Sequence, residues 1–181
     1  MFISGEKCIK VVPSGDFPHF PHSFPQRRGG CYLEGKERDG YMMLYGRFEH
    51  NMDAKGRVFV PVKLREKLGE TFIAACVLDR CVSLYSMEEW NSLLEKLASG
   101  PMAETRKLLR RVTESAEDVT PDAQGRILLN KNLIAHASLE KPALIIGAGR
   151  RAEIWNPAVY EAEMADMTDE KLEEEFIKYG F

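Results

Sequence analysis

The chain of 181 residues lacks any apolar run that approaches the roughly 18 residues needed to span a membrane. It does not open with the charged segment and apolar stretch that mark a protein for export. Its four cysteines include no C-x-x-C pair, and Cys76 and Cys81 lie in an apolar stretch where cysteine usually acts as a small core residue. These features favour a cytoplasmic protein, kept in a reducing compartment, without a membrane partner.

Enzymatic signatures are also missing from the sequence. No Ser, Cys or Asp lies in a recognisable nucleophile elbow. Gly147-Ala148-Gly149 lacks the third glycine and the following helix of a dinucleotide-binding loop, so we expect a hairpin turn at Gly147–Arg150. His19 and His22 have no further ligands at metal-binding spacing. The sequence therefore predicts no enzyme activity, no cofactor, no metal and no small-molecule substrate.

What the chain does have is an internal repeat. The pentapeptide Asp53-Ala54-Lys55-Gly56-Arg57 returns 69 positions later as Asp122-Ala123-Gln124-Gly125-Arg126, with only the middle residue changed. The apolar residues after it are matched as well, since Val58-Phe59-Val60 corresponds to Ile127-Leu128-Leu129. Two copies of one supersecondary unit usually form a single pseudo-symmetric domain, because neither copy can bury its apolar face alone.

The repeated pentapeptide has the residues of a type I turn, with Asp in the first position and Gly in the fourth. A turn does not require the arginine that follows, Arg57 in the first copy and Arg126 in the second. Each arginine could form a local ion pair with its Asp, which contributes little when exposed. Alternatively, a rigid turn could present the guanidinium to a phosphate or a guanine, the geometry that Arg suits best. The spacing alone leaves both interpretations open.

Hydrophobic periodicity, capping residues and turn residues predict a mixture of short strands and helices. We expect strands at 44–51, 57–60, 72–77, 81–85, 118–120, 127–129, 143–146 and 152–155. We expect helices at 62–68, from Ser86 to Gly100, at about 102–114, at about 131–137, from Pro157 onward and at 168–179. Ser86 and Glu89 have the spacing of a capping box at the start of the second of these helices.

The net charge of −3 conceals an asymmetry along the chain. From Tyr45 to Gly69, six basic residues face three acidic ones, a net charge of +3. From Glu153 to Lys178, nine acidic residues face two basic ones, a net charge of −7. Such blocks point to a polyanion-binding face with an acidic opposite end, or to ordinary solvated surfaces.

The first 42 residues differ from the rest of the chain. Four of the nine prolines fall here, and neither strand-like alternation nor a helical stripe persists. We therefore expect residues 1–42 to be a disordered extension. Because Met42-Met43 immediately precedes the first patterned strand, we also expect that translation naturally starts at one of these two methionines.

The motifs taken together closely resemble those of the MraZ family. In the first half these are the run Tyr45–Arg57, Val60-Pro61 and Leu64-Arg65. In the second half they are Asp122–Arg126, Leu139-Glu140-Lys141, Ile146-Gly147 and Glu153-Ile154-Trp155. The resemblance covers about residues 43–165, with both halves in register.

This resemblance implies a fold and a function. MraZ proteins are bacterial transcriptional regulators related to AbrB and MazE. Their fold is α+β but mainly β: a pseudo-two-fold, double-split β-barrel with swapped hairpins, made from two tandem repeats and decorated with helices. The chain would then consist of a first repeat with helices at 43–114, a second repeat of the same barrel at 115–165 and an acidic C-terminal helix at 166–181.

The resemblance further implies a sequence-specific regulator of the cell-division and cell-wall gene cluster, in the cytoplasm and at the nucleoid. It would bind repeated double-stranded DNA sites in its own promoter region as a ring-like homo-oligomer. The family's D-x-x-x-R motif assigns DNA binding to the two loops, and the short helix adds Arg65. The expected DNA-binding residues are Asp53, Lys55, Gly56, Arg57, Arg65, Asp122, Gln124, Gly125 and Arg126.

The second copy departs from the family pattern. Asn130-Lys131 replaces the usual Pro after the second strand, and Ile134 stands at the position that Arg65 holds in the first copy. Because Gln124 also replaces Lys55, we expect the first copy to be more basic and to contribute more to DNA binding. The alternative function is an antitoxin-type interaction module of the AbrB/MazE class, in which the acidic C-terminal helix docks a partner.

Overall fold

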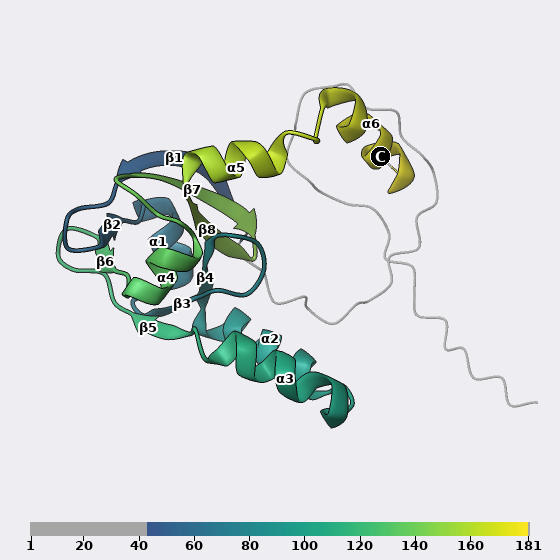
Figure 1. Ribbon diagram of the computed structural model, residues 1–181, viewed down its shortest axis with the longest axis horizontal. Helices are drawn as coiled ribbons and strands as arrows, with labels where there is room; N and C mark the ends of the chain where they lie inside the picture. Colours follow the sequence, from purple (N-terminus) through teal and green to yellow (C-terminus); the bar gives the residue numbers. More distant parts are fainter. Residues whose placement is uncertain (1–42, 181) are drawn as a thin grey trace, which may run out of the picture. The chain divides into compact units, whose positions relative to one another are not determined.

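The computed structural model describes residues 43–180 (Figure 1), apart from the side chain of Met102. The extension 1–42 and the expected start site at Met42 or Met43 lie at or beyond the edge of this range. Within it, no helix is both long and apolar enough to cross a bilayer.

Each repeat contributes four strands and at least one helix, in the same order. The first contains β1 (Leu44–Asn51), β2 (Arg57–Phe59), α1 (Val62–Leu68), β3 (Phe72–Ala75) and β4 (Val82–Ser86). Helices α2 (Met87–Ala98) and α3 (Met102–Thr113) follow it. The second contains β5 (Glu117–Val119), β6 (Arg126–Leu128), α4 (Lys131–His136), β7 (Pro142–Gly149) and β8 (Arg151–Trp155), followed by α5 (Pro157–Met164) and α6 (Asp169–Lys178).

Capping residues define several of the helix ends. The Ser86 side chain accepts a hydrogen bond from the Glu89 amide at 3.2 Å, as the sequence predicted. Gly69, with φ of +97°, ends α1. Asn130, which replaces the family's usual Pro, caps α4 by accepting from the Leu133 amide at 2.9 Å. The departure in the second copy therefore exchanges one helix-starting residue for another.

The hairpin of the second repeat differs from the prediction. The sequence placed a turn at Gly147–Arg150, whereas β7 continues through Gly149 and β8 begins at Arg151. The reason is a long ladder between β1 and β7, which pairs Leu44 with Gly149 at one end. Gly147 is needed inside this ladder, because a Cβ there would lie 2.3 Å from the Tyr45 amide nitrogen.

The two repeats exchange strands. Six strands form one antiparallel sheet in the order β1-β7-β8-β4-β3-β5, so the first strand of each repeat pairs with the hairpin of the other. Strands β2 and β6 form a separate two-stranded ribbon. The α+β class and the exchanged hairpins agree with the prediction, whereas among residues 43–180 no ladder joins β1 to β5 to close a barrel.

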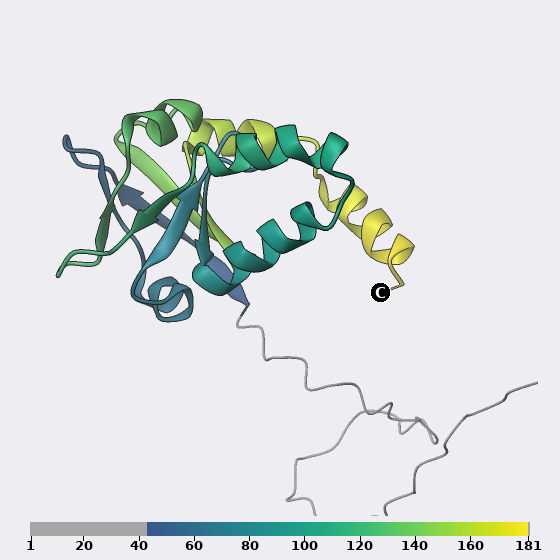
Figure 2. The ribbon, with the colours of Figure 1, turned by 90° about the horizontal axis from the view of Figure 1, so that it is seen from below.

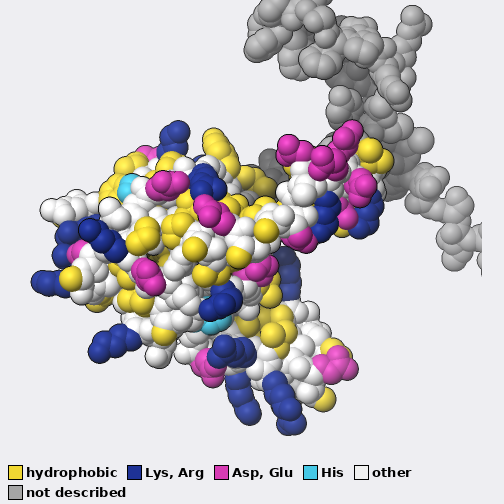
Figure 3. Space-filling view, turned by 45° about the horizontal axis from the view of Figure 1, so that its top comes forward, with side chains coloured by type: hydrophobic (Ala, Val, Ile, Leu, Met, Phe, Trp, Pro, Cys, Tyr) yellow, Lys and Arg dark blue, Asp and Glu magenta, His cyan; other side chains and the backbone are white. Residues whose placement is uncertain are grey.

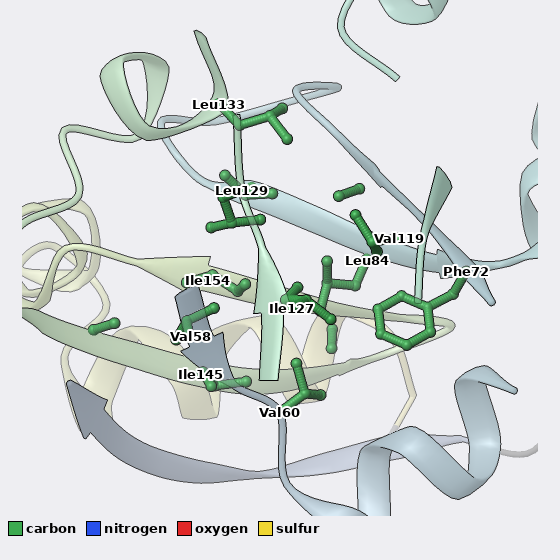
Figure 4. Packing of buried hydrophobic residues seen from close by; sticks show 14 of the residues in the cluster. Val58, Val60, Phe72, Leu84, Val119, Ile127, Leu129, Leu133, Ile145 and Ile154 are labelled. Carbon is green, nitrogen blue, oxygen red and sulfur yellow. The ribbon is translucent and has the colours of Figure 1, made fainter. Parts of the chain in front are cut away.

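The core lies between the ribbon and the sheet. Val58 of β2 and Ile127 of β6 are fully buried and pack in the same cluster as Leu84, Ile145 and Ile154 of the sheet (Figure 4). Both repeats supply this cluster, so neither can bury its apolar face without the other. Burying each such side chain contributes about 1.5–3 kcal/mol to folding.

The helices between and after the repeats pack on smaller clusters. In α2, Trp90 contacts Tyr85 of β4, with ring centroids 5.7 Å apart. In α5, Tyr160 lies edge-on to Trp155 of β8 at 5.5 Å. Cys81 is buried in the latter cluster, and burial raises the pKa of its thiol to about 12, consistent with the predicted core role.

Candidate nucleic-acid interface

The first pentapeptide forms a closed turn between β1 and β2. The Gly56 amide donates to the Asp53 carbonyl at 2.9 Å, and the Asp53 amide donates to the Arg57 carbonyl at 2.9 Å. The Asp53 carboxylate oxygen Oδ1 accepts from the amides of Lys55 at 2.9 Å and Arg57 at 3.0 Å. The Asp therefore organises the turn through backbone amides, as its residue type predicted.

The second pentapeptide forms the same turn between β5 and β6. Asp122 Oδ1 accepts from the amides of Gln124 at 2.9 Å and Arg126 at 3.0 Å. The Gly125 amide donates to the Asp122 carbonyl at 2.7 Å. Gly56 and Gly125 have φ of +81° and +77°, a region that L side chains rarely adopt. The repeat thus preserves both the sequence and the hydrogen bonds of the turn.

Each arginine forms an ion pair with the Asp of its own loop, which was one of the two interpretations that the sequence left open. Arg57 Nε donates to Asp53 Oδ2 at 2.7 Å. Arg126 donates to Asp122 Oδ2 from Nε at 2.9 Å and from Nη2 at 2.7 Å. A guanidinium has five N–H donors, so these bonds orient the group and leave its other N–H donors available. About 30% of each arginine side chain stays exposed, 31% for Arg57 and 29% for Arg126.

The aspartates are held in their ionised form by these bonds. The Arg126 side-chain hydrogen bond, helped by the Arg126 amide, lowers the pKa of Asp122 to about 2. The pKa of Asp53 is lowered as well, chiefly by the backbone amide of Arg57. Both loops therefore keep an ionised aspartate beside the arginine at neutral pH.

The ribbon presents both arginines on one face. In its register Arg57 lies opposite Leu128, Val58 opposite Ile127, and Phe59 opposite Arg126. Val58 and Ile127 point into the core, so the other four side chains share the outer face because strand residues alternate. The outer face is therefore made of two arginines and two apolar side chains, Phe59 and Leu128.

The loops lie at the two ends of the ribbon, and each is held by the other repeat. Because β2 and β6 are antiparallel, each loop lies beside the point where the strand of the other repeat ends. The Val60 amide donates to the Gly125 carbonyl at 3.0 Å, and the Leu129 amide donates to the Gly56 carbonyl at 3.0 Å. The side chain of Ile134 covers Gly56, since a Cβ there would lie 3.0 Å from Ile134 Cδ1.

Arg65 lies at the second loop, not at the first. A Cβ on Gly125 would meet the Arg65 guanidinium at 2.8 Å, and Arg65 Nε donates to the Val60 carbonyl at 2.9 Å. Its guanidinium carbon is also 5.9 Å from the centroid of the Phe59 ring. The expectation that Arg65 adds to the charge of the first loop is therefore wrong. Lys55 belongs to the first loop, whereas Arg65 lies against the second.

The ribbon lies at one end of residues 43–180, and the α2/α3 helical hairpin lies at the other (Figures 1 and 2). Figure 3 shows Lys and Arg side chains at the ribbon end and a separate group along the helical hairpin. The second group belongs to α3, whose exposed basic residues are Arg106, Lys107, Arg110 and Arg111.

The sequence reasoning missed Phe59 and Leu128 as members of this surface. The signal was available in the alternation of both strands, because the fully buried Val58 and Ile127 place their neighbours on the opposite face. Phe59 is partly covered by His50, with ring centroids 4.9 Å apart. Leu128 remains 59% exposed.

Within residues 43–180 no group of three or more His, Cys, Asp or Glu side chains could hold a metal ion. This region offers a short ribbon with oriented cations on its outer face.

Comparisons with known proteins identify the family of the chain. The family described as "MraZ protein, putative antitoxin-like" matches residues 43–111 and 113–177. Among curated relatives, the "Transcriptional regulator MraZ" of Acetivibrio thermocellus is 42% identical over 142 residues, which cover 76% of this chain and 99% of the relative. The protein of the same name from Thermoanaerobacter sp. is 43% identical over 134 residues, 73% of this chain and 93% of the relative. The protein of the same name from Heliobacterium modesticaldum is 47% identical over 116 residues, which cover 63% of this chain and 81% of the relative. The chain belongs to the MraZ family, whose members are transcriptional regulators rather than a class of enzyme.

Proposed function

We propose that the protein binds double-stranded DNA with the outer face of the β2/β6 ribbon and the two Asp-x-x-Gly-Arg loops. The observation that supports this most directly is the doubled Asp–Arg arrangement. Both loops use an Asp to fix an arginine at the same point of the turn, with the guanidinium partly exposed. A prearranged guanidinium binds guanine or phosphate without the entropic cost of ordering a free side chain.

The arrangement of cations favours a nucleic acid over a protein partner for this face. Arg57, Arg126, Lys55 and Arg65 surround one short ribbon, although the chain as a whole has a net charge of −3. Asp53 and Asp122 pair with the two arginines. Nine further acidic residues lie between Glu153 and Lys178. A local cationic surface of this kind neutralises phosphates and is expected to give salt-dependent binding.

We further propose that several copies bind together. One ribbon offers only two loops, and linking several weak contacts raises the overall affinity without new contacts. A ring-like homo-oligomer whose copies each contact one DNA repeat would supply such linkage. The repeats would lie in the promoter of the protein's own gene, ahead of the cell-division and cell-wall cluster, and the protein would act in the cytoplasm at the nucleoid.

The test is fluorescence anisotropy with the full chain and the DNA immediately upstream of its own gene. A scrambled duplex of equal length is the control, and both are measured at two salt concentrations. We expect tighter binding to the upstream DNA, weakened by salt for both duplexes. Equal affinity for the two duplexes would remove the sequence-specific part of the proposal.

The terminal helix supports a second candidate function, an antitoxin-type interaction module. Helix α6 buries none of its residues, and it carries five acidic residues in ten. Leu172, Phe176 and Tyr179 line a shallow apolar cavity of about 220 Å³ on it. A protein partner with an apolar and basic surface would fit this helix, and a toxin gene next to this one would favour that function.

A further inference from the structure

Leu128 is the outer-face residue that phosphate binding does not explain. The two arginines of that face suit phosphate or guanine, and Phe59 is partly covered by His50 and Arg65. Leu128, at the position that corresponds to Phe59 in the repeat, is 59% exposed and lies directly across the ladder from Arg57. An apolar side chain between two oriented arginines suits a ligand that carries hydrogen-bond acceptors or negative charge beside a small apolar group.

Duplex DNA offers such a combination in the major groove. The groove is about 12 Å wide and admits a two-stranded β-ribbon. Its floor carries guanine acceptors for arginine and a single apolar group, the C5-methyl of thymine. The minor groove has no methyl group and is about half as wide.

The register of the ribbon sets the spacing of these contacts. Residues directly opposite each other in an antiparallel ladder have Cα atoms about 4.5–5.5 Å apart. One base-pair step rises about 3.4 Å, so extended side chains from two such residues span one or two steps. Arg57 and Leu128 therefore reach the same base pair or adjoining ones.

We infer that Leu128 reads sequence by packing on the C5-methyl group of a thymine beside the guanine that Arg57 binds. This inference rests on the proposed DNA-binding function and adds the groove and the base. The arginines set affinity and register, whereas Leu128 discriminates thymine from the other bases. The corresponding Phe59 is already partly covered, so the two halves of the ribbon read different bases.

The experiment removes the methyl group from the DNA and the side chain from the protein. The full-length wild type first selects its preferred duplex from a random-sequence pool. Each thymine in that duplex is then replaced singly by deoxyuracil, which differs only in lacking the C5-methyl group. Affinities are measured for wild type, Leu128→Ala and Leu78→Ala. Leu78 is a matched control, because it is 58% exposed but lies outside the ribbon.

We expect one thymine whose replacement weakens wild-type binding about four-fold, the effect of burying one methyl group. Leu128→Ala binds the original duplex more weakly and is indifferent to that replacement, whereas Leu78→Ala behaves as wild type. The salt dependence of Leu128→Ala stays unchanged, because no phosphate contact is lost. Melting curves confirm that both variants fold.

Three results would overturn the inference. If wild type binds duplexes but tolerates deoxyuracil at every position, no thymine methyl is read, whatever the variants do. If Leu128→Ala keeps the same sensitivity as wild type, another residue reads the methyl group. If wild type binds no duplex at all, the proposed DNA-binding function fails together with this inference, so the two failures are distinguishable.

Discussion

The guanidinium of Arg65, from helix α1 of the first repeat, lies directly against Gly125 in the loop of the second repeat. A Cβ on Gly125 would be 2.8 Å from the Arg65 guanidinium carbon, and the Val60 amide bonds to the Gly125 carbonyl at 3.0 Å. The contacts between the two repeats therefore also build the proposed DNA-binding surface. Each loop is completed by residues from the other repeat, so the proposed surface cannot be divided into two independent halves.

This contact predicts which substitutions depend on each other. Arg65→Ala and Arg126→Ala should be non-additive in DNA binding, with an interaction energy of at least about 0.5 kcal/mol, because both act at the second loop. Arg65→Ala and Arg57→Ala should add, since Arg57 lies at the other end of the ribbon. A double-mutant cycle measured by fluorescence anisotropy gives both values.

Ile134→Ala is the matched control for that cycle, since Ile134 covers the first loop as Arg65 covers the second. It should couple to Arg57→Ala and not to Arg126→Ala. Coupling of Arg65 to Arg57 instead would show that Arg65 serves the loop of its own repeat.

Arg57→Ala should weaken binding to the preferred DNA by about 1–3 kcal/mol for each contact removed, the range for a bidentate arginine–guanine pair. If several copies bind together, the loss multiplies and specific binding is abolished. Arg57→Lys should restore little of it, because an ammonium lacks the planar fork. Melting curves should stay close to wild type, since a partly exposed ion pair contributes little to folding. A folded Arg57→Ala protein with wild-type affinity would leave the loop as a structural turn only.

Much of the local structure followed from the sequence because it depends on neighbouring residues. The Asp and Gly of each pentapeptide predict the turn, and Ser86 with Glu89 predicts the start of α2. The tandem repeat predicted one pseudo-symmetric domain, and Val58 and Ile127 of the two copies lie in one core cluster with residues of the sheet. These features need only the spacing of residue types along the chain.

The features that the sequence did not predict depend on pairing between distant segments. The family resemblance placed Arg65 in the short helix of the first copy, and we expected it to make that copy more basic. The antiparallel ribbon instead brings its guanidinium to the second loop. Gly147 was assigned to a turn because glycine favours turns, whereas the ladder with β1 requires a residue without a side chain there. In both cases the strand register between the two repeats determines where the residue lies. The residue pattern within one repeat carries no information about that register.

Gly125→Ala should weaken DNA binding more than backbone strain alone explains. An L residue at φ of +77° costs about 1–2 kcal/mol of stability. The added Cβ would also displace the Arg65 guanidinium. Gly149→Ala is the control, because its φ of +74° imposes the same strain while its Cβ would come no closer than 3.5 Å to Met43 Cε.

Comparing the two glycine variants separates the effects. Both should lower the melting temperature, and only Gly125→Ala should lower the affinity of the folded protein for DNA. Equal affinities for the two variants would mean that the contact between Arg65 and the second loop has no part in binding.

The two aspartates should respond differently when their arginines are removed. The pKa of Asp122 is lowered from its ordinary 3.8 to about 2, chiefly by the Arg126 side chain. That of Asp53 is lowered chiefly by the Arg57 backbone amide, which remains when the side chain is truncated. Arg126→Ala should therefore move the Asp122 titration up toward 3.8, whereas Arg57→Ala should leave the Asp53 carboxyl pKa still lowered.

Because a lowered carboxyl pKa favours the folded state only while the group is ionised, the contribution of Asp122 to stability is complete above about pH 4. It is lost as the pH falls through 2, and Arg126→Ala should remove this part of the acid dependence. Carboxyl-detected NMR titration of wild type and both variants measures the midpoints. If the Asp122 midpoint in wild type lies near 3.8, the ion pair does not form in solution and the oriented arginine of the second loop is lost with it.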